Sequence, residues 1–113
     1  MITLEIKYRV ASANAGAFEK MIKNIYGPAL ARQQGFVGYR LLREYSEAER
    51  KEIEATSDGY QFHLELTFES EELRRKWVAS PEHDPAFKEA KKLAEQIVHN
   101  GYHLVQDNLL LKA

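Results

Sequence analysis

Two nine-residue segments with the same alternation constrain the fold more than any other feature of the sequence. Residues 2–10 (ITLEIKYRV) alternate apolar with polar side chains, and residues 60–68 (YQFHLELTF) repeat the pattern. A period of two sends successive side chains to opposite faces of a strand, so each segment predicts a strand with one buried face. The 113 residues favour one domain, 1–113, with a single hydrophobic core.

Composition excludes several classes of protein. The chain has no cysteine, which excludes disulfides, thiolate metal sites and cysteine nucleophiles. Its 16 basic and 17 acidic residues leave no cationic surplus for a nucleic-acid partner. Every apolar run is much shorter than the ~18 residues of a membrane span, and no secretory leader is evident. We therefore expect a soluble, cytoplasmic protein without a nucleic-acid or membrane partner.

A helix is predicted between the first two strands. Asn14 is the expected N-cap, and Gly35 ends the segment. Because Pro28 lacks a backbone donor, we expect a kink or break near Gly27-Pro28. The apolar residues fall at helical spacing and form one stripe, namely Phe18, Met21, Ile22, Ile25, Ala29 and Leu30.

A second helical region follows the strand at 60–68. Ser70 is the expected cap of a short helix that carries Leu73 and Trp77 on one face, and Ser80-Pro81 interrupts it. Asp84 and Pro85 then suit the N-cap and first position of a further helix. Its predicted apolar stripe is Phe87, Ala90, Leu93, Ala94, Ile97 and Val98, with a stop at Asn100-Gly101.

Two further strands complete the predicted order. Residues 36–45 place Val37, Tyr39, Leu41 and Tyr45 on one face, and the charged residues 46–59 form a solvated connection. Residues 102 to about 110 form a last strand with weak alternation. The order β-α-β-β-α-β predicts an α+β ferredoxin-like fold, in which both helices cover one face of a four-stranded antiparallel sheet. Right-handed crossovers place the first and third strands in the centre.

The face of the sheet without helices predicts a second copy of the chain. It presents the polar row of the central strands, Thr3, Glu5, Lys7, Arg9, Gln61, His63, Glu65 and Thr67. The sequence Leu109-Leu110-Leu111 favours a partner as well, because a loose tail rarely exposes three leucines. We expect a homodimer whose two sheets face each other.

The second helical region carries a family resemblance. Trp77, then Ser80-Pro81-Glu82-His83, then Phe87-Lys88-Glu89-Ala90, in a chain of this element order, resemble the antibiotic-biosynthesis-monooxygenase-like group of dimeric α/β barrels. The resemblance implies a homodimeric barrel that takes a small molecule. The group includes cofactor-free quinone-forming oxygenases, haem-degrading enzymes and signal-molecule processing enzymes.

The haem-degrading branch fits the sequence poorly. That branch resembles this chain at Trp77 and at Phe87-Lys88-Glu89-Ala90, but its haem-ligating histidine is replaced by Lys91. The asparagine of its first strand is also missing. A lysine is protonated near neutrality and makes a poor iron ligand, so we expect no cofactor.

The cofactor-free branch asks for an apolar slot, a base and donors that stabilise an anion. His83 is the candidate base, since an ordinary imidazole titrates near neutrality. Trp77, likewise a candidate catalytic residue, has the alternative of a core position on the sheet, and His83 that of a solvated loop residue between Glu82 and Asp84. The candidate slot lies between helices and sheet, lined by Tyr8, Tyr39, Phe62, Trp77 and Phe87.

His63 and Glu65 form a second candidate constellation. Two residues apart on one strand, they point to the same face with ~7 Å between their Cα atoms. They suit an acid/base pair or half of a metal site, which His103 would extend if the last strand turned it inward. The alternative, which predicts no metal, is that these charges pair across strands and across the dimer interface.

Two functions of different class remain open on the sequence. The first is a cofactor-independent monooxygenase that acts on a small aromatic or quinol-type molecule within a homodimeric α/β barrel. The second is a dimeric barrel that binds a small molecule, or serves in a stress response, without catalysis. The enzyme requires a titratable group facing the pocket, whereas the binding protein does not.

Overall fold

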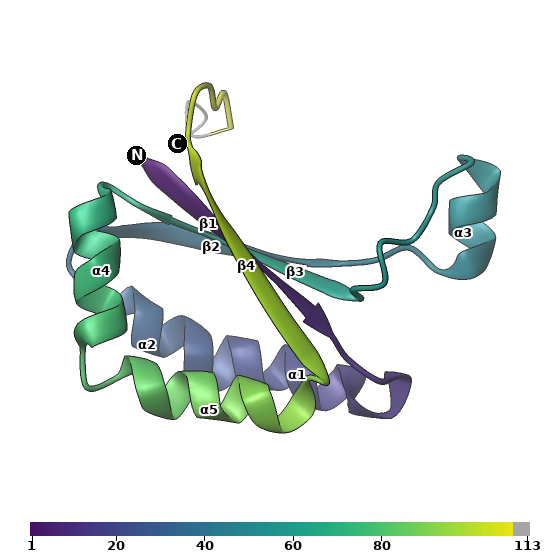
Figure 1. The fold of residues 1–113 in the computed structure, drawn as a ribbon, viewed down its shortest axis with the longest axis horizontal. Helices are drawn as coiled ribbons and strands as arrows, with labels where there is room; N and C mark the ends of the chain where they lie inside the picture. Colours follow the sequence, from purple (N-terminus) through teal and green to yellow (C-terminus); the bar gives the residue numbers. More distant parts are fainter. Residues whose placement is uncertain (110–113) are drawn as a thin grey trace.

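A four-stranded antiparallel sheet with its helices on one face is the framework of the protein (Figure 1). The computed structural model describes residues 1–109. The strand order is β2-β3-β1-β4, and the strands are β1 (Ile2–Arg9), β2 (Phe36–Arg43), β3 (Phe62–Phe68) and β4 (Gln96–His103). The α+β ferredoxin-like prediction is confirmed, with the first and third strands in the centre. The sheet is open in the single chain, and its closure into a dimeric α/β barrel stays a prediction.

The two alternating segments bury the side chains that their pattern predicts. In β3, Phe62, Leu64, Leu66 and Phe68 are buried against the helices while the residues between them are half-buried. β1 pairs with β3 from Ile2↔Phe68 to Tyr8↔Phe62, so the apolar rows of both strands lie on the same face. Removing this apolar area from water is the main gain of the fold.

The first helical region is one continuous helix. It comprises η1 (Ser12–Asn14), α1 (Ala15–Met21), the π-helix η2 (Ile22–Tyr26) and α2 (Gly27–Ala31). Of the kink or break expected near Gly27-Pro28, the break is wrong: the helix continues, with the wider π turn directly before Gly27 and Pro28 at the start of α2. The Asn14 side chain makes no capping bond, which corrects its predicted role.

The second helical region is confirmed in its first half. α4 (Glu71–Ala79) begins at Ser70, whose side chain accepts a hydrogen bond from the Leu73 N–H. α5 (His83–Leu93) begins two residues earlier than the sequence predicts, so Asp84 is not the N-cap and Pro85 lies inside the first turn.

The end of α5 corrects the sequence prediction more strongly. Ile97 and Val98 belong to β4, where they pair with Tyr8 and Lys7. Asn100-Gly101 is no helix stop and lies inside the same strand. Two adjacent apolar residues after a helix fit the period of a helix and that of a strand equally well. Their pairing with β1 places them in a strand. The expected last strand at 102–110 therefore ends at His103, and Leu110 and Leu111 lie outside the described residues.

A β-bulge corrects the predicted faces of β2. The register runs Phe36↔Phe68 and then Gly38↔Thr67, so Val37 is the extra residue. The bulge turns Phe36 toward the core, where its ring lies 5.6 Å from that of Phe68, and leaves Val37 exposed. The sequence had placed Val37, not Phe36, on the face that Tyr39 and Leu41 share.

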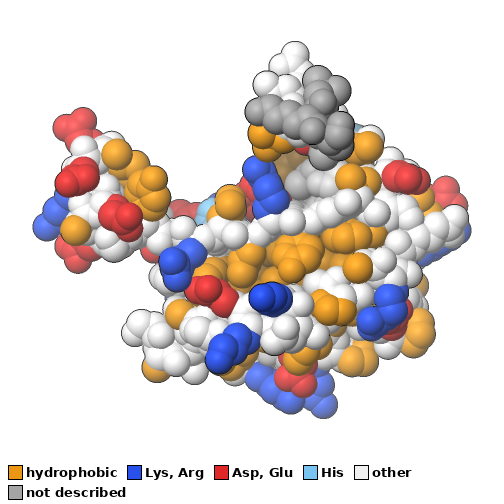
Figure 2. Space-filling view, turned by 180° about the vertical axis from the view of Figure 1, so that it is seen from behind, with side chains coloured by type: hydrophobic (Ala, Val, Ile, Leu, Met, Phe, Trp, Pro, Cys, Tyr) orange, Lys and Arg blue, Asp and Glu red, His pale blue; other side chains and the backbone are white. Residues whose placement is uncertain are grey.

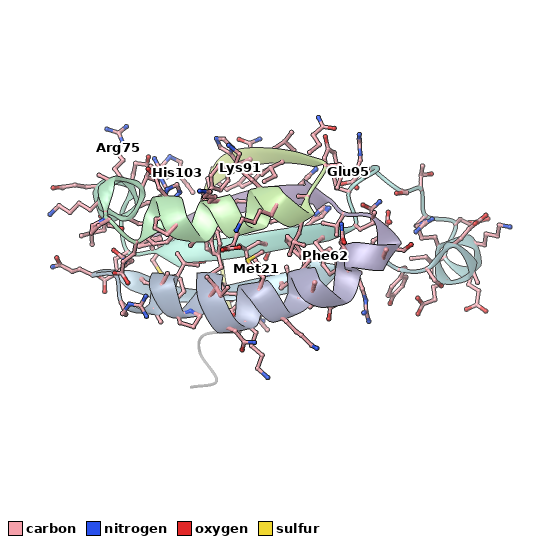
Figure 3. All side chains as sticks on the ribbon, turned by 90° about the horizontal axis from the view of Figure 1, so that it is seen from below. Met21, Phe62, Arg75, Lys91, Glu95 and His103 are labelled. Carbon is pink, nitrogen blue, oxygen red and sulfur yellow. The ribbon has the colours of Figure 1, made fainter. Side chains whose placement is uncertain are left out.

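The core lies between the sheet and the helices. Figures 1 and 3 show α5 and the α1–α2 helix side by side across the sheet, and Met21 and Phe62 lie in the layer between them. Phe18 joins the two sides, because its ring lies 4.7 Å from Tyr8 and 4.9 Å from Phe62. No helix of residues 1–109 is both long and apolar enough to cross a membrane.

The connection between β2 and β3 contains a short helix, α3 (Glu47–Glu52). We call residues 44–59 the arm, because Figure 1 shows α3 at the far end of the sheet, clear of the other helices. The predicted solvated connection is confirmed, since α3 has no buried residue.

Candidate functional site: a cavity on the open face

The open face, meaning the face of the sheet without helices, contains a cavity of about 460 Å³. This volume lies within the range of small-molecule sites. Its lining residues come from all four strands and from the segment after β4, and they are Thr3, Glu5, Val37, Gly38, Tyr39, Arg40, Glu65, Thr67, Tyr102, His103, Leu104, Asp107 and Leu109.

Local sequence explains why the cavity forms at this end of the sheet. Gly38 has no side chain to fill the space between Thr67 and the bulged Val37. On the other side, β4 ends and the Leu104 N–H donates to the Met1 carbonyl at 3.1 Å, which turns residues 104–109 along the rim. The result is a hollow with apolar and aromatic walls around a polar floor.

Two carboxylates form the floor of the cavity. Glu5 and Glu65 are directly opposite each other on β1 and β3. The Arg40 guanidinium, next along on β2, forms an ion pair with Glu65. Glu5 Oε2 lies 3.7 Å from His63 Nδ1, which is longer than a hydrogen bond. Glu65 is therefore held by a cation, while Glu5 has an oxygen available to a ligand.

His63 connects Glu5 to the outer end of the open face. Its Nε2 lies 3.1 Å from Asp58 Oδ2, and Lys7 Nζ lies 3.4 Å from the same oxygen. Partial burial works to raise the pKa of Asp58, but the Tyr60 N–H hydrogen bond, His63 and Lys7 outweigh it and hold that pKa below its usual value. Asp58 is thus a stable anion beside the histidine.

A pair of hydroxyls lies next to the carboxylates. Thr3 Oγ1 and Thr67 Oγ1 are 2.9 Å apart across β1 and β3. One hydroxyl donates to the other, and the accepting hydroxyl keeps its own proton for a further acceptor. The cavity therefore offers a proton acceptor at Glu5 and a neutral hydroxyl donor at the Thr3–Thr67 pair. Thr3 is two residues before Glu5 on β1, on the same face of the strand.

The sequence-predicted residues His83, Trp77 and Phe87 do come together, but on the helix side of the sheet. The His83 ring stacks on Phe87 at 5.6 Å and meets the edge of Trp77 at 5.0 Å. Its Nδ1 lies 3.0 Å from Asp84 Oδ1. Trp77 is buried and packs against Tyr26, which matches its alternative interpretation as a core residue.

The five predicted slot residues do not line one common cavity. Tyr8 and Phe62 are buried in the core, and the cavities described for residues 1–109 do not have Tyr8, Trp77 or Phe87 in their walls. Tyr39 lies on the edge strand beside the open-face cavity, but its pairing with Leu66 turns its side chain to the helix side, where its hydroxyl lies close to Gly27 of α2.

The predicted constellation of His63, Glu65 and His103 is also divided. Glu65 and His103 line the open-face cavity, whereas His63 lines a neighbouring hollow toward the arm. Within residues 1–109, no group of three His, Asp or Glu side chains is placed to hold a metal ion. The predicted cross-strand pairing is seen where Arg40 meets Glu65 and where His63 faces Glu5.

Sequence reasoning missed several residues of the site. Asp58 lies in the connection between strands, and only the return of the chain brings it to His63. The turn-prone Ser57-Asp58-Gly59 was a signal for the turn but not for this contact. Tyr102 reaches the cavity because β4 pairs it with Thr3, which the misplaced helix end had hidden. Asp107 follows the last strand without any periodic signal.

The fold and the cavity define a class of protein, the ferredoxin-like α+β domain with a cavity on the open face of its sheet. The chain belongs to the antibiotic biosynthesis monooxygenase family, whose family model matches residues 1–93. No curated protein matches the sequence.

Solved structures confirm the fold across nearly the whole chain. SnoaB, a cofactor-independent oxygenase from Streptomyces nogalater, is 21% identical with a TM-score of 0.74, covering 95% of each chain. At3g17210 from Arabidopsis thaliana is 17% identical with a TM-score of 0.77, covering 96% of this chain and 99% of its own. A hydroxynitrile lyase from Passiflora edulis is 21% identical with a TM-score of 0.73, covering 89% and 90%. At these identities the similarity establishes the fold alone.

Proposed function

We propose that the protein is a cofactor-independent monooxygenase that oxidises a small aromatic phenol, anthrone or quinol in the open-face cavity of a homodimer. The observation that carries the proposal is the cavity itself, in which the available carboxylate of Glu5 lies among apolar walls. Membership in the monooxygenase family and the similarity of fold to SnoaB, a cofactor-independent oxygenase, support the reaction class.

The reaction needs no group beyond the substrate, dioxygen and the protein. An electron-rich substrate such as an anthrone loses a proton from the carbon to be oxidised, and its delocalised anion then reduces dioxygen. One oxygen atom becomes the new carbonyl oxygen. The other leaves as water together with the two hydrogens that the carbon loses. The protein supplies a base for the first step and stabilises the anion.

Glu5 is the proposed base. Glu65 is held by Arg40, whereas the Glu5 carboxylate faces the cavity with His63 as its neighbour at 3.7 Å. His63 lies beside the proposed base on its outward side, with Nε2 3.1 Å from Asp58 Oδ2. A spare hydroxyl proton of the Thr3–Thr67 pair would stabilise the negative charge that develops on the substrate oxygen.

A second location for the base rests on its own observation. His83 is held between aromatic rings, and Asp84 orients its Nδ1, an arrangement that general bases use. Substrate access there would require the packed side chains around Trp77 to move. The open-face cavity needs no such opening, so we assign the reaction to it.

Oxygen uptake by chelator-treated protein tests the proposed function. We expect saturable uptake with a panel of anthrones and hydroquinones, and with an anthrone one dioxygen should be consumed per anthraquinone formed. Glu89→Gln is the matched control, because Glu89 is a carboxylate on α5, on the helix side of the sheet and away from the cavity. Saturable binding of the panel without any turnover would contradict the enzyme and support the non-catalytic binding protein instead.

A further inference from the structure

The charges in the walls of the open-face cavity do not balance. Within residues 1–109 the walls carry three carboxylates, those of Glu5, Glu65 and Asp107, and one guanidinium, that of Arg40. Arg40 forms its ion pair with Glu65. Neither Glu5 nor Asp107 lies within ion-pair distance of a lysine or arginine in this part of the chain. The negative charge of these two carboxylates is therefore left for a ligand to offset.

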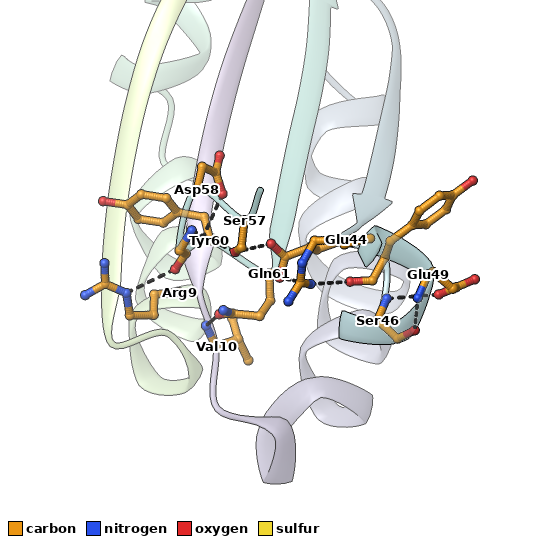
Figure 4. A network of polar contacts seen from close by, with 12 residues as sticks. Arg9, Val10, Glu44, Ser46, Glu49, Ser57, Asp58, Tyr60 and Gln61 are labelled. Atoms are coloured by element: carbon orange, nitrogen blue, oxygen red, sulfur yellow. Dashed lines mark hydrogen bonds and ion pairs between the residues drawn. The ribbon is translucent and has the colours of Figure 1, made fainter. Parts of the chain in front are cut away.

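The arm end of the same face treats its carboxylates differently (Figure 4). Glu44 Oε2 lies 3.3 Å from Arg50 Nη1. Asp58 Oδ2 lies 3.1 Å from His63 Nε2 and 3.4 Å from Lys7 Nζ. Each of these two carboxylates has a basic side chain of the same chain beside it. The unbalanced negative charge is therefore a property of the cavity and not of the open face as a whole.

Asp107 is turned toward the cavity by the rim segment. Residues 104–109 stand above the sheet in Figures 1 and 2, and Figure 2 shows hydrophobic side chains on the main body below them. Val105 is 86% exposed, whereas the charged Asp107 is half-buried and lines the cavity. The Leu109 N–H donates to Asp107 Oδ1 at 2.8 Å, which fixes the carboxylate. Because taking a carboxylate out of water without a cation costs free energy, this position favours a positively charged ligand.

The proposed reaction adds to the negative charge. Glu5 becomes neutral when it accepts the proton, and the substrate becomes an anion. Glu65 stays paired with Arg40, so the anion forms in a cavity whose remaining unbalanced charge is that of Asp107. Like charges at close range raise the free energy of such an intermediate, and apolar walls increase this cost. A positive charge on the substrate itself would offset both negative charges.

An organic cation suits the walls better than a metal ion. No group of three His, Asp or Glu side chains among residues 1–109 is placed to hold a metal. The walls instead include the apolar Val37 and Leu109 and the ring of Tyr102, which is 50% exposed. Such walls cover a flat ring, and the face of an aromatic side chain also attracts an ammonium group. The cavity therefore fits an aromatic ring that carries a protonated amine.

We propose that the substrate of the open-face cavity carries an ammonium group, which binds to Asp107 at the rim while the reacting end of the ring lies at Glu5 on the floor. This inference rests on the proposed function and deepens it, because it narrows the phenols, anthrones and quinols to those with an amine side chain. Asp107 is then the residue that determines specificity, and Glu5 remains the base.

Anaerobic calorimetry with three matched hydroquinones tests the inference without turnover. The compounds share one ring and differ in its side chain, which is aminoethyl, hydroxyethyl or carboxymethyl and hence cationic, neutral or anionic near neutrality. Asp107→Asn is the test variant, since its amide oxygen can still accept the hydrogen bond from the Leu109 N–H. Glu89→Gln, which removes a carboxylate on α5, is the matched control.

We expect the ammonium compound to bind about tenfold more tightly than the neutral one, the effect of one hydrogen bond to a charged group, and the carboxylate compound to bind most weakly. Asp107→Asn should remove the ammonium advantage and leave the neutral compound unchanged, whereas Glu89→Gln should change neither. Added salt should narrow the difference. Equal affinities, tightest binding of the carboxylate compound, or an ammonium advantage that Asp107→Asn retains in full would overturn the inference.

Oxygen uptake with the same three compounds separates this inference from the proposed function. Preferential binding of the ammonium compound without oxygen uptake removes the proposed reaction and leaves the charge preference of the cavity standing. Oxygen uptake that does not distinguish the three side chains removes the charge preference and leaves the reaction standing.

Discussion

Glu5 and Glu65 face each other directly across the two central strands. Like charges in directly opposed positions destabilise a sheet by a few tenths of a kcal/mol up to ~1 kcal/mol. Arg40 offsets the charge of Glu65, and the remaining repulsion falls on Glu5. A position that costs stability in the folded state is typical of a functional residue.

We therefore expect Glu5→Gln to stabilise the protein by about 0.5 kcal/mol while it lowers turnover. Urea unfolding measures the stability. Glu65→Gln is the comparison, and it should bring no gain because it also breaks the ion pair with Arg40. A loss of stability in Glu5→Gln would show that the opposed carboxylates are not in conflict.

Tyr8 and Tyr26 should titrate apart from the other tyrosines. Burial raises the pKa of Tyr26 to about 12 and, with the nearby Tyr26 as a further cause, raises that of Tyr8 well above its ordinary value. Tyr8 Oη has no hydrogen-bond partner among residues 1–109. Phenolate absorbance of Tyr8→Phe and of Tyr26→Phe, compared with the unchanged protein, should each lack a component that ionises above pH 10.

The same pKa shifts predict how stability depends on pH. A group whose pKa is raised on folding stabilises the native state fully below its unfolded pKa, near 10 for tyrosine, and this contribution is lost as pH rises toward the folded value. The free energy of unfolding should therefore fall between pH 10 and about 12. The fall should be smaller in Tyr26→Phe. Simultaneous titration of all six tyrosines near pH 10 would contradict the burial argument.

Two glycines of the first helical region should respond oppositely to alanine. A Cβ on Gly27 would lie 2.9 Å from the Ile22 carbonyl of the π turn and 2.8 Å from Tyr39 Oη, so Gly27→Ala should destabilise. Gly16 has open space around it in α1, and Gly16→Ala should stabilise by about 0.5–1 kcal/mol. Thermal unfolding of both variants compares them, and equal shifts would indicate that η2 does not hold Gly27 as described.

The Ser70 cap offers a test of the second helical region. Ser70→Ala removes the hydrogen bond from the Leu73 N–H at 3.2 Å and should cost about 1 kcal/mol of stability. Ser12→Ala is the control, because η1 begins without a side-chain cap at all. Urea unfolding that fails to separate the two variants would contradict the capping role.

Much of the fold follows from the alternation of β1 and β3. Leu64 and Leu66 are buried and Glu65 is not, as period two requires, and the cap at Ser70 follows from local hydrogen bonding. The errors came where local patterns are ambiguous or long-range pairing decides. Ile97 and Val98 suit a helix as well as a strand, and only their pairing with β1 places them in β4.

The site followed from the sequence only in part. Glu65 and Tyr39 line the cavity, but a bulge at Val37 and a chain turn after His103 create the hollow, and neither has a periodic signal. His83, Trp77 and Phe87 were correctly expected near one another as base and slot, although Trp77 lies on α4 and the other two residues on α5. That expectation gave no information on whether the cluster faces a cavity or packs into the core.

The ratio of kcat/KM between two variants tests most directly whether the reaction belongs to the open face. Oxygen uptake is measured for Glu5→Gln and for His83→Ala with the same anthrone. The account predicts a loss of at least about 100-fold in Glu5→Gln, the size expected when a general base is removed, and little change in His83→Ala. Unchanged turnover in Glu5→Gln with a comparable loss in His83→Ala would move the reaction to the helix side and contradict the account.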